Sequence, residues 1–143
     1  MKSIKMHRNV KRGLAVLPGA AALVALAGTP ASAAQWTYDI RTTDGHPGGQ
    51  AIGRVYYQGT GGGCYRAGVD GYLYDREADG YGVIVYLRGR SCSTGKIVEA
   101  EAGYIGGNGK STYYNFGYYE GLKNVTAKVC LLKNNRDYYC RTA

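Results

Sequence analysis

The chain has 143 residues, 18 of them Lys or Arg and 10 of them Asp or Glu. Its length suits a single domain and is short for two. Five of the basic residues lie within the first 12 positions, so the remainder carries 13 basic against 10 acidic residues. This small surplus argues against a nucleic-acid-binding protein, which presents a strongly basic patch.

The first segment of the chain has the three parts of a secretory signal peptide. A basic leader ends at Arg12, an apolar run covers Leu14–Gly28, and small residues follow. Their spacing allows cleavage after Ala33 or one residue later. The long basic leader and the alanine-rich run are typical of a Gram-positive bacterial signal.

A transmembrane anchor is the alternative interpretation of the same segment. A membrane span needs about 20 apolar residues, whereas this run is shorter and contains Pro18. We therefore expect residues 1–33 to be removed and residues 34–143 to form one secreted domain without a membrane span.

The composition after residue 33 predicts an all-β fold. All 15 Tyr and 20 of the 23 Gly fall there, and tyrosine favours strands while glycine favours tight turns. Strand-like runs separated by turn residues are expected at 36–41, 52–58, 64–74, 81–88, 96–105, 111–119, 124–132 and 136–142. Closely spaced strands pair antiparallel, so we expect an antiparallel sandwich or small barrel of about eight short strands.

Several of these runs alternate apolar and polar residues, which places the apolar ones on a single face. Val69 and Leu73 share a face in one run, Val83 and Val85 share a face in the next, and Val129 belongs to a third such face. We expect these faces to form the core.

The acidic residues alternate in the run Asp-Arg-Glu-Ala-Asp-Gly at 75–80. Asp75, Glu77 and Asp79 followed by glycine resemble the start of an EF-hand loop, which makes them a weak calcium candidate. The twelfth position is Tyr86 instead of the bidentate glutamate, and strands are expected on both sides of the loop. The alternative is a polar hairpin turn, and we expect no bound metal or cofactor.

The sequence contains no evident catalytic set, and we expect a protein that is not an enzyme. His46 is the one imidazole after the signal segment, and no nucleophile motif accompanies it. Glu99 and Glu101 share one strand face and would suit glycoside cleavage. Acidic residues at alternate positions are, however, common on solvated faces.

Four cysteines lie after the signal segment: Cys64, Cys92, Cys130 and Cys140. An even number in an exported chain predicts two disulfides, and no Cys-x-x-Cys spacing supports a zinc site. A turn centred on Asn135 would place Cys130 opposite Cys140, and Lys133 opposite Asp137. We therefore favour a Cys130–Cys140 bridge, which leaves the other two cysteines to pair with each other.

Tyrosines give the strongest remaining signal for function. Neighbouring tyrosines on a strand point to opposite faces, so one of each pair is expected to be exposed. Exposed tyrosine offers a large, stiff contact area at a small entropic cost, which suits recognition of a glycan or a protein. Packing in a thin core is the alternative. The candidate ligand-binding residues are Tyr72, Tyr74, Tyr113, Tyr114, Tyr118 and Tyr119.

Two short patterns carry a resemblance. An Asp-Gly turn precedes a strand within residues 74–83, and a Val-Cys…Cys pattern closes the chain from Val129 to Cys140. From about Gly63 onward the chain resembles small exported β proteins of actinobacteria that have no assigned activity. The resemblance implies export, a β fold and a terminal disulfide, and it assigns no catalytic residue.

Together these observations predict a secreted, non-enzymatic binding module whose tyrosine-rich β face takes a polysaccharide or cell-surface ligand. The alternative is a secreted protein that binds or inhibits an extracellular hydrolase through a rigid loop, such as Gly59–Gly63 or Gly106–Lys110. The expected partner is thus an extracellular glycan or protein.

Overall fold

The computed structural model describes residues 33–43, 47–107 and 109–143. Residues 1–32, with nearly all of the expected signal peptide, and His46 lie outside the described residues. The described residues form the strands β1 (Ala34–Thr43), β2 (Pro47–Gly61), β3 (Cys64–Asp75), β4 (Gly82–Ser91), β5 (Ile97–Gly106), β6 (Lys110–Lys133) and β7 (Arg136–Thr142). The all-β prediction is confirmed. Within this part of the chain, no helix has the length and apolar character needed to cross a membrane.

All neighbouring strands run antiparallel. They are hydrogen-bonded in the order β1-β2-β3-β6-β4-β5, and β7 pairs with β6. The path does not return to β1, so the sheet of described strands is not closed. Of the two predicted arrangements, this favours the sandwich.

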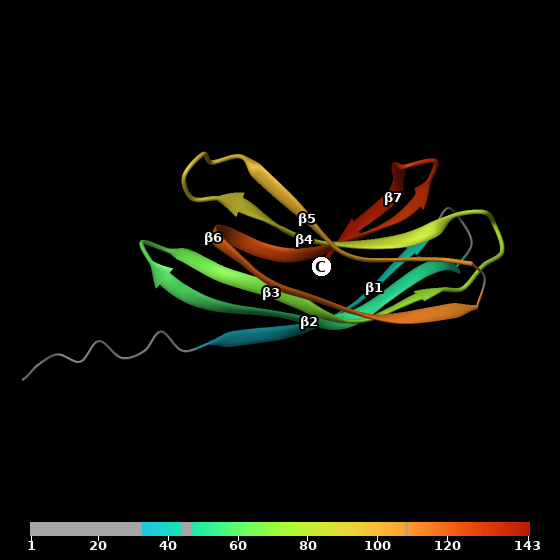
Figure 1. Ribbon diagram of the computed structural model, residues 1–143, viewed down its shortest axis with the longest axis horizontal. Coiled ribbons are helices and arrows are strands. Elements are labelled where there is room, and N and C mark those ends of the chain that lie inside the picture. The colour runs from blue at the N-terminus through green and yellow to red at the C-terminus, as the bar shows by residue number, and fades with distance from the viewer. Residues whose placement is uncertain (1–32, 44–46, 108) are drawn as a thin grey trace, which may run out of the picture.

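Strand β6 folds back on itself. Its first residue, Lys110, pairs with Asp75 at the end of β3, and Leu132 near its other end pairs with Gly82 at the start of β4. Asp75 and Gly82 are seven positions apart, a reach of roughly 25 Å, whereas 22 extended residues would span roughly 75 Å. The two ends of β6 must therefore lie close together, and Figure 1 shows the strand running out along one layer and returning in the other.

The reversal of β6 lies around Gly121 and Asn124, whose φ angles of 69° and 50° are both positive. Hydrogen bonding continues through it, because Leu122 pairs with both β3 and β4. Two runs predicted as separate strands, 111–119 and 124–132, are therefore the two legs of one element. This explains why seven strands form where about eight were expected.

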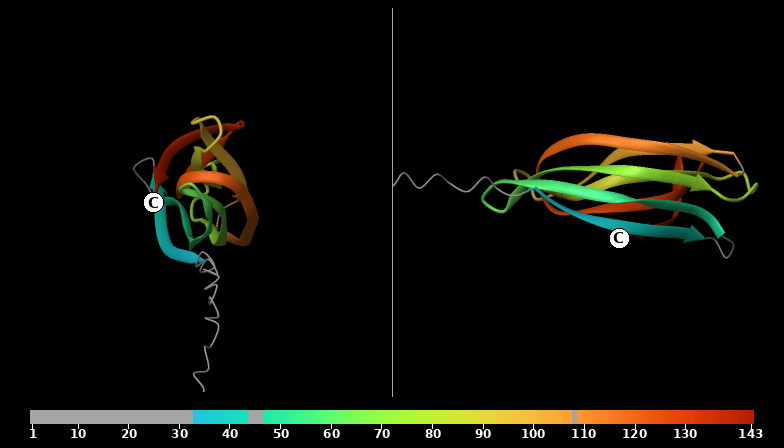
Figure 2. Two further views of the ribbon diagram at one scale, coloured as in Figure 1. Left: turned by 90° about the vertical axis from the view of Figure 1, so that its left-hand side faces the viewer. Right: turned by 90° about the horizontal axis from the view of Figure 1, so that it is seen from below.

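The result is two layers packed face to face, seen in Figure 1 and from two further directions in Figure 2. The first layer holds β1, β2, β3 and the first leg of β6, and the second holds the returning leg with β4, β5 and β7. Inward side chains of both layers make one core, as in an antiparallel sandwich. The predicted period-two faces are confirmed, since Leu73, Val85 and Val129 are fully buried.

A pair of tyrosine hydroxyls lies inside this core. The hydroxyls of Tyr38 and Tyr114 hydrogen-bond to each other, which satisfies two buried polar groups. Gly53 leaves room for them, because a Cβ there would lie 2.7 Å from the Tyr114 hydroxyl oxygen and 3.0 Å from that of Tyr38. Burial raises the pKa of Tyr38 to about 12 and also raises the pKa of Tyr114, so both hydroxyls stay protonated.

The turn between β6 and β7 has a different register from the predicted one. Asn134 and Asn135 form a two-residue turn with φ angles of 52° and 59°, which asparagine tolerates well. Lys133 therefore pairs with Arg136, and the prediction that it lies opposite Asp137 is wrong. A two-residue turn in place of one centred on a single residue moves the register by one position.

An irregularity further along this hairpin produces the predicted disulfide. The register shifts between Val129 and Leu131, and Tyr139 on the facing strand has a positive φ of 48°. The shift brings Cys140 opposite Cys130, with Cα atoms 4.1 Å apart, and the two are bonded. The predicted pairing is confirmed, although the turn from which it was argued is not.

The second predicted disulfide, Cys64–Cys92, is also present. It joins the start of β3 in the first layer to the residue that follows β4 in the second. The amide of Cys92 donates to the carbonyl oxygen of Gly121 at 2.8 Å, so this bridge lies at the end where β6 reverses. A covalent link and a hydrogen bond thus hold the two layers together at one end of the sandwich.

Candidate functional site

The outer face of the first layer collects exposed aromatic side chains. On β2, β3 and β6, the residues that alternate with core positions point outward. Rows of paired residues cross these strands, so side chains far apart in the sequence lie side by side. We call this surface the tyrosine face and define it by Ile52, Arg54, Tyr56, Asp70, Tyr72, Tyr74, Tyr113, Asn115 and Tyr118.

An aromatic row crosses the tyrosine face. Tyr72 pairs with Ile52 on one side and with Tyr113 on the other, and both tyrosines are more than half exposed, at 53% and 54%. The Tyr72 ring lies 5.4 Å from that of Tyr113 in an edge arrangement. It lies 6.5 Å from the Tyr74 ring, with an angle of 32° between the two planes. Tyr72 and Tyr74 therefore turn their ring faces in similar directions.

A polar row runs beside the aromatic one. The Nε and Nη2 groups of Arg54 donate to the two carboxylate oxygens of Asp70 at 2.8 and 2.9 Å, and Asn115 pairs with Asp70 from the next strand. The hydrogen-bonded carboxylate raises the pKa of Arg54, so the guanidinium stays charged. About half of the Arg54 side chain is exposed (51%), which leaves its other N–H groups for a ligand.

At one end of the tyrosine face, the ring of Tyr56 packs over a glycine of β3. The Tyr56 ring lies over Gly68, where a Cβ would come within 2.6 Å of the ring. The Tyr56 hydroxyl reaches across β3 and donates to two backbone carbonyl oxygens of β6, at 3.0 and 2.9 Å. Tyr118 packs edge-on against Tyr56 at 5.5 Å and carries the guanidinium of Arg66 over its ring at 4.1 Å. One side of the Tyr118 ring is therefore already occupied.

The six tyrosines predicted to bind a ligand do not all share this surface. Tyr114 points away from Tyr113 into the core and is only 3% exposed, so it cannot contact a ligand there. Tyr119 pairs with the buried Ala67 at a register shift and lies outside the aromatic row. Tyr118 belongs to the tyrosine face but packs against Tyr56 rather than in that row. Tyr72, Tyr74 and Tyr113 are the members that the fold brings together.

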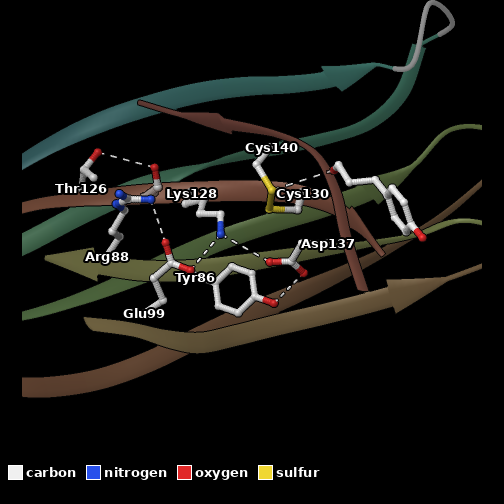
Figure 3. A network of polar contacts seen from close by, with 10 residues as sticks. Tyr86, Arg88, Glu99, Thr126, Lys128, Cys130, Asp137 and Cys140 are labelled. Carbon is white, nitrogen blue, oxygen red and sulfur yellow. Dashed lines mark hydrogen bonds and ion pairs between the residues drawn. A yellow bond between two sulfur atoms is a disulfide. The ribbon is translucent and has the colours of Figure 1, made fainter. Parts of the chain in front are cut away.

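The outer face of the second layer carries a network of charges (Figure 3). Lys128 lies between Glu99 and Asp137, with its Nζ 2.8 and 3.3 Å from their carboxylate oxygens. Arg88 contacts the same Glu99 at 2.7 Å, and the Tyr86 hydroxyl donates to Asp137 at 2.9 Å. Burial and the neighbouring Asp137 raise the pKa of Tyr86, so it remains a donor. Each of these charges is already paired, so the network stabilises the layer.

The calcium candidate does not gather its carboxylates. Asp75, Glu77 and Asp79 lie at and after the end of β3, and their carboxylate oxygens do not all lie within 4.8 Å of one another. Asp75 and Asp79 instead accept the backbone N–H groups of Glu77, at 3.3 Å, and of Tyr81, at 2.9 Å. These are contacts of a polar turn. The turn is not the predicted hairpin, because β3 and β4 do not pair with each other and the connection crosses from one layer to the other.

Another group of potential metal ligands consists of Cys130, Asp137 and Cys140, whose ligand atoms lie within 4.8 Å of one another. Both sulfurs are bonded to each other and cannot act as thiolate ligands. The described residues contain no other group of three such side chains.

Asp75 carries an electrostatic cost in the folded state. It is almost fully buried, and its Oδ2 atom has no hydrogen-bond partner among the described residues. Burial raises the pKa of Asp75, the amides of Glu77 and Gly107 lower it, and the charge of Asp79 raises it, with a net rise.

We expect Asp75→Asn to increase the free energy of unfolding at neutral pH and to have little effect in acid. A raised pKa means that the folded protein holds a proton that the unfolded chain has lost, so the wild type loses stability as the pH rises from 3.8 through the folded pKa. Urea unfolding of both proteins between about pH 3 and pH 7 measures the difference. A difference that does not change with pH, or that favours the wild type at neutral pH, would contradict this expectation.

The two outer faces thus differ in character. The tyrosine face presents exposed rings and a half-exposed guanidinium, whereas the charged side chains around Lys128 are paired with one another.

Comparison of the chain with protein-family models, with curated proteins and with solved structures gave no match.

Proposed function

We propose that the protein is a secreted, non-enzymatic module that binds a polysaccharide through the tyrosine face. The observation that supports this most strongly is the aromatic row of Ile52, Tyr72 and Tyr113, with Tyr74 beside it on β3. A sugar ring has an apolar C–H face that packs on aromatic rings, and hydroxyl groups that need hydrogen-bond partners. The tyrosine face supplies both kinds of contact side by side.

The arrangement suits an extended glycan lying along β3. Tyr72 and Tyr74 are successive outward residues on this strand, so their positions repeat at about 7 Å. Their similar ring orientation lets one chain contact both. Tyr113 then forms a flank, and Arg54 donates its remaining N–H groups from the neighbouring row.

The two disulfides support an extracellular role. Both bridges are formed in the folded protein, and structural disulfides persist in oxidising compartments. The signal peptide expected at residues 1–33 would supply the route of export.

We expect the purified protein to be retained on at least one of insoluble chitin, insoluble cellulose and isolated cell walls, and Tyr72→Ala/Tyr113→Ala to remove most of that retention. With about 1 kcal/mol lost for each ring, the double variant would bind about 30-fold more weakly. Depletion isotherms of the soluble protein give the apparent Kd for each support.

The matched control is Tyr138→Ala/Tyr139→Ala, because these neighbouring tyrosines are exposed on β7, in the other layer. Their removal should change the apparent Kd by less than about twofold. No retention of the wild type on any support, or equal losses in the two double variants, would disprove the proposal. If mass spectrometry instead finds one stoichiometric protein partner and no polysaccharide, the protein-binding alternative replaces it.

A further inference from the structure

A cleft of about 950 Å³ opens on the outer face of the second layer. Its floor includes Gly82 and Ile84 of β4 and Leu132 of β6. Because β4 lies between β5 and β6, residues of β5 form one wall and the turn after β6 forms the opposite one. The connection from β3 to β4 lines a further side. The cleft lies in the opposite layer from the tyrosine face and shares no residue with it.

A bulge in β5 brings two side chains of different chemistry into this cleft. Val85 and Tyr86 are consecutive on β4, but they pair with Gly103 and Glu101, so β5 has one extra residue between these partners. Without it, Glu101 and Tyr104 would be three positions apart on a regular strand and would face opposite sides. With the bulge, both line the cleft.

The Tyr104 side chain packs over two glycines, Gly82 and Gly106. Gly82 and Gly106 pair across β4 and β5, and a Cβ on either one would lie 2.6 Å from the Tyr104 hydroxyl oxygen. The ring therefore lies over the sheet, in space that side chains would otherwise fill. Tyr104 is still 50% exposed, so one side of the ring is open to a ligand in the cleft.

The cleft carries an excess of negative charge. Glu99, two positions before Glu101 on the same strand face, is held by two cations. Among the described residues, by contrast, no ion pair engages Glu101 or Glu77, the two carboxylates of the cleft. Lys133 is the single cation among the described lining residues, and its Nζ lies 4.6 Å from the centre of a tyrosine ring. A cationic ligand would complement this surface.

We propose that the cleft is a second saccharide site, whose ligand is a hexosamine unit with a free, protonated amine. The sugar ring packs on Tyr104, and its ammonium group bonds to Glu101 on the same strand, which combines an aromatic contact with a charge-assisted hydrogen bond, while Glu77 adds negative charge to the cleft. A neutral hexose would supply the ring without the charge and would desolvate the carboxylates without a partner. This inference does not rest on the tyrosine face, because the two surfaces belong to different layers.

Isothermal titration calorimetry with a glucosamine tetramer tests the proposal. The purified protein, with both disulfides formed, is titrated at a mildly acidic pH at which the sugar amine is protonated. We expect binding that weakens as salt is added, because the ion pairs are partly exposed. Glu101→Gln should raise the Kd about tenfold, and an N-acetylglucosamine tetramer, which lacks the charge, should bind at least about tenfold more weakly than the amine form.

Two further variants separate the ring from the charge. Gly106→Ala displaces the Tyr104 ring without changing a charge, because a Cβ there meets only atoms of that ring and its hydroxyl, and it should also raise the Kd. Glu120→Gln is the matched control, because this glutamate is exposed and pairs with Arg66 in the other layer. It should leave the Kd unchanged.

The proposal fails if the amine tetramer does not bind, if the acetylated tetramer binds equally well, or if either Glu101→Gln or Gly106→Ala leaves the Kd unchanged. An equal loss in Glu120→Gln would also overturn it. Because these titrations use a soluble ligand and different residues, a negative result on insoluble polysaccharides would disprove only the function proposed for the tyrosine face.

Discussion

The Cys64→Ala/Cys92→Ala variant is expected to lose about 3.6 kcal/mol in free energy of unfolding. The two cysteines are 28 positions apart, and the cross-link restricts the unfolded chain by an amount that grows with the logarithm of the loop length. The Cys130–Cys140 bridge closes a loop with a separation of only 10, so its removal should cost about 2.7 kcal/mol.

Urea unfolding of the two double-alanine variants measures both losses on the same scale. The Cys64→Ala/Cys92→Ala variant also has a local effect that can be measured. The amide at position 92, which donates to the carbonyl oxygen of Gly121, should lose protection from hydrogen exchange when this disulfide is removed. A smaller loss for the longer loop than for the shorter one would show that the bridges do not act mainly through the unfolded chain.

The second large effect is expected for Leu73→Ala, which should cost about 2–5 kcal/mol. Leu73 is fully buried in the core, and its cross-strand neighbours in the first layer are Ala51 and Thr112. Both neighbours are short, so they cannot fill the cavity that the substitution leaves. We therefore expect a loss in the upper part of this range, measured by urea or thermal unfolding.

The matched control for Leu73→Ala is Ile97→Ala, because Ile97 begins β5 and is an exposed apolar residue. Its loss should stay within about 0.5 kcal/mol. Similar losses at the two positions would mean that the core does not lie between the two layers.

Strand alternation predicted the core because burial on one face is strictly periodic. Leu73 and Val129 could be assigned to inward faces from spacing alone. The register of the last hairpin could not be predicted in this way. A slip of one position at Asn135 changes which residues of β6 and β7 pair, but it leaves the alternation within each strand unchanged. The register shift that aligns the cysteines is accompanied by a positive φ at Tyr139, and nothing in the sequence predicts this backbone conformation for a tyrosine.

The binding surfaces could be predicted only in part. Alternation requires Tyr113 and Tyr114 to face opposite ways, but the pairing of Tyr113 with Tyr72 decides which one is exposed. The sequence did not predict that Glu101 and Tyr104 lie on the same face of β5. Residues three apart on a strand share a face only where a bulge lies between them. Tertiary pairing, and not local pattern, assembles both surfaces.

The fold-back of β6 also constrains the order in which the protein folds. Because β6 contributes a strand to both layers, neither layer is complete until residues 110–133 are available. Such long-range pairing delays folding, since distant segments must meet before the core gains its contacts. In a chain synthesised from its N-terminus, the core would therefore close only after residues 110–133 had emerged, so the first three strands would wait for a partner that comes late in the sequence.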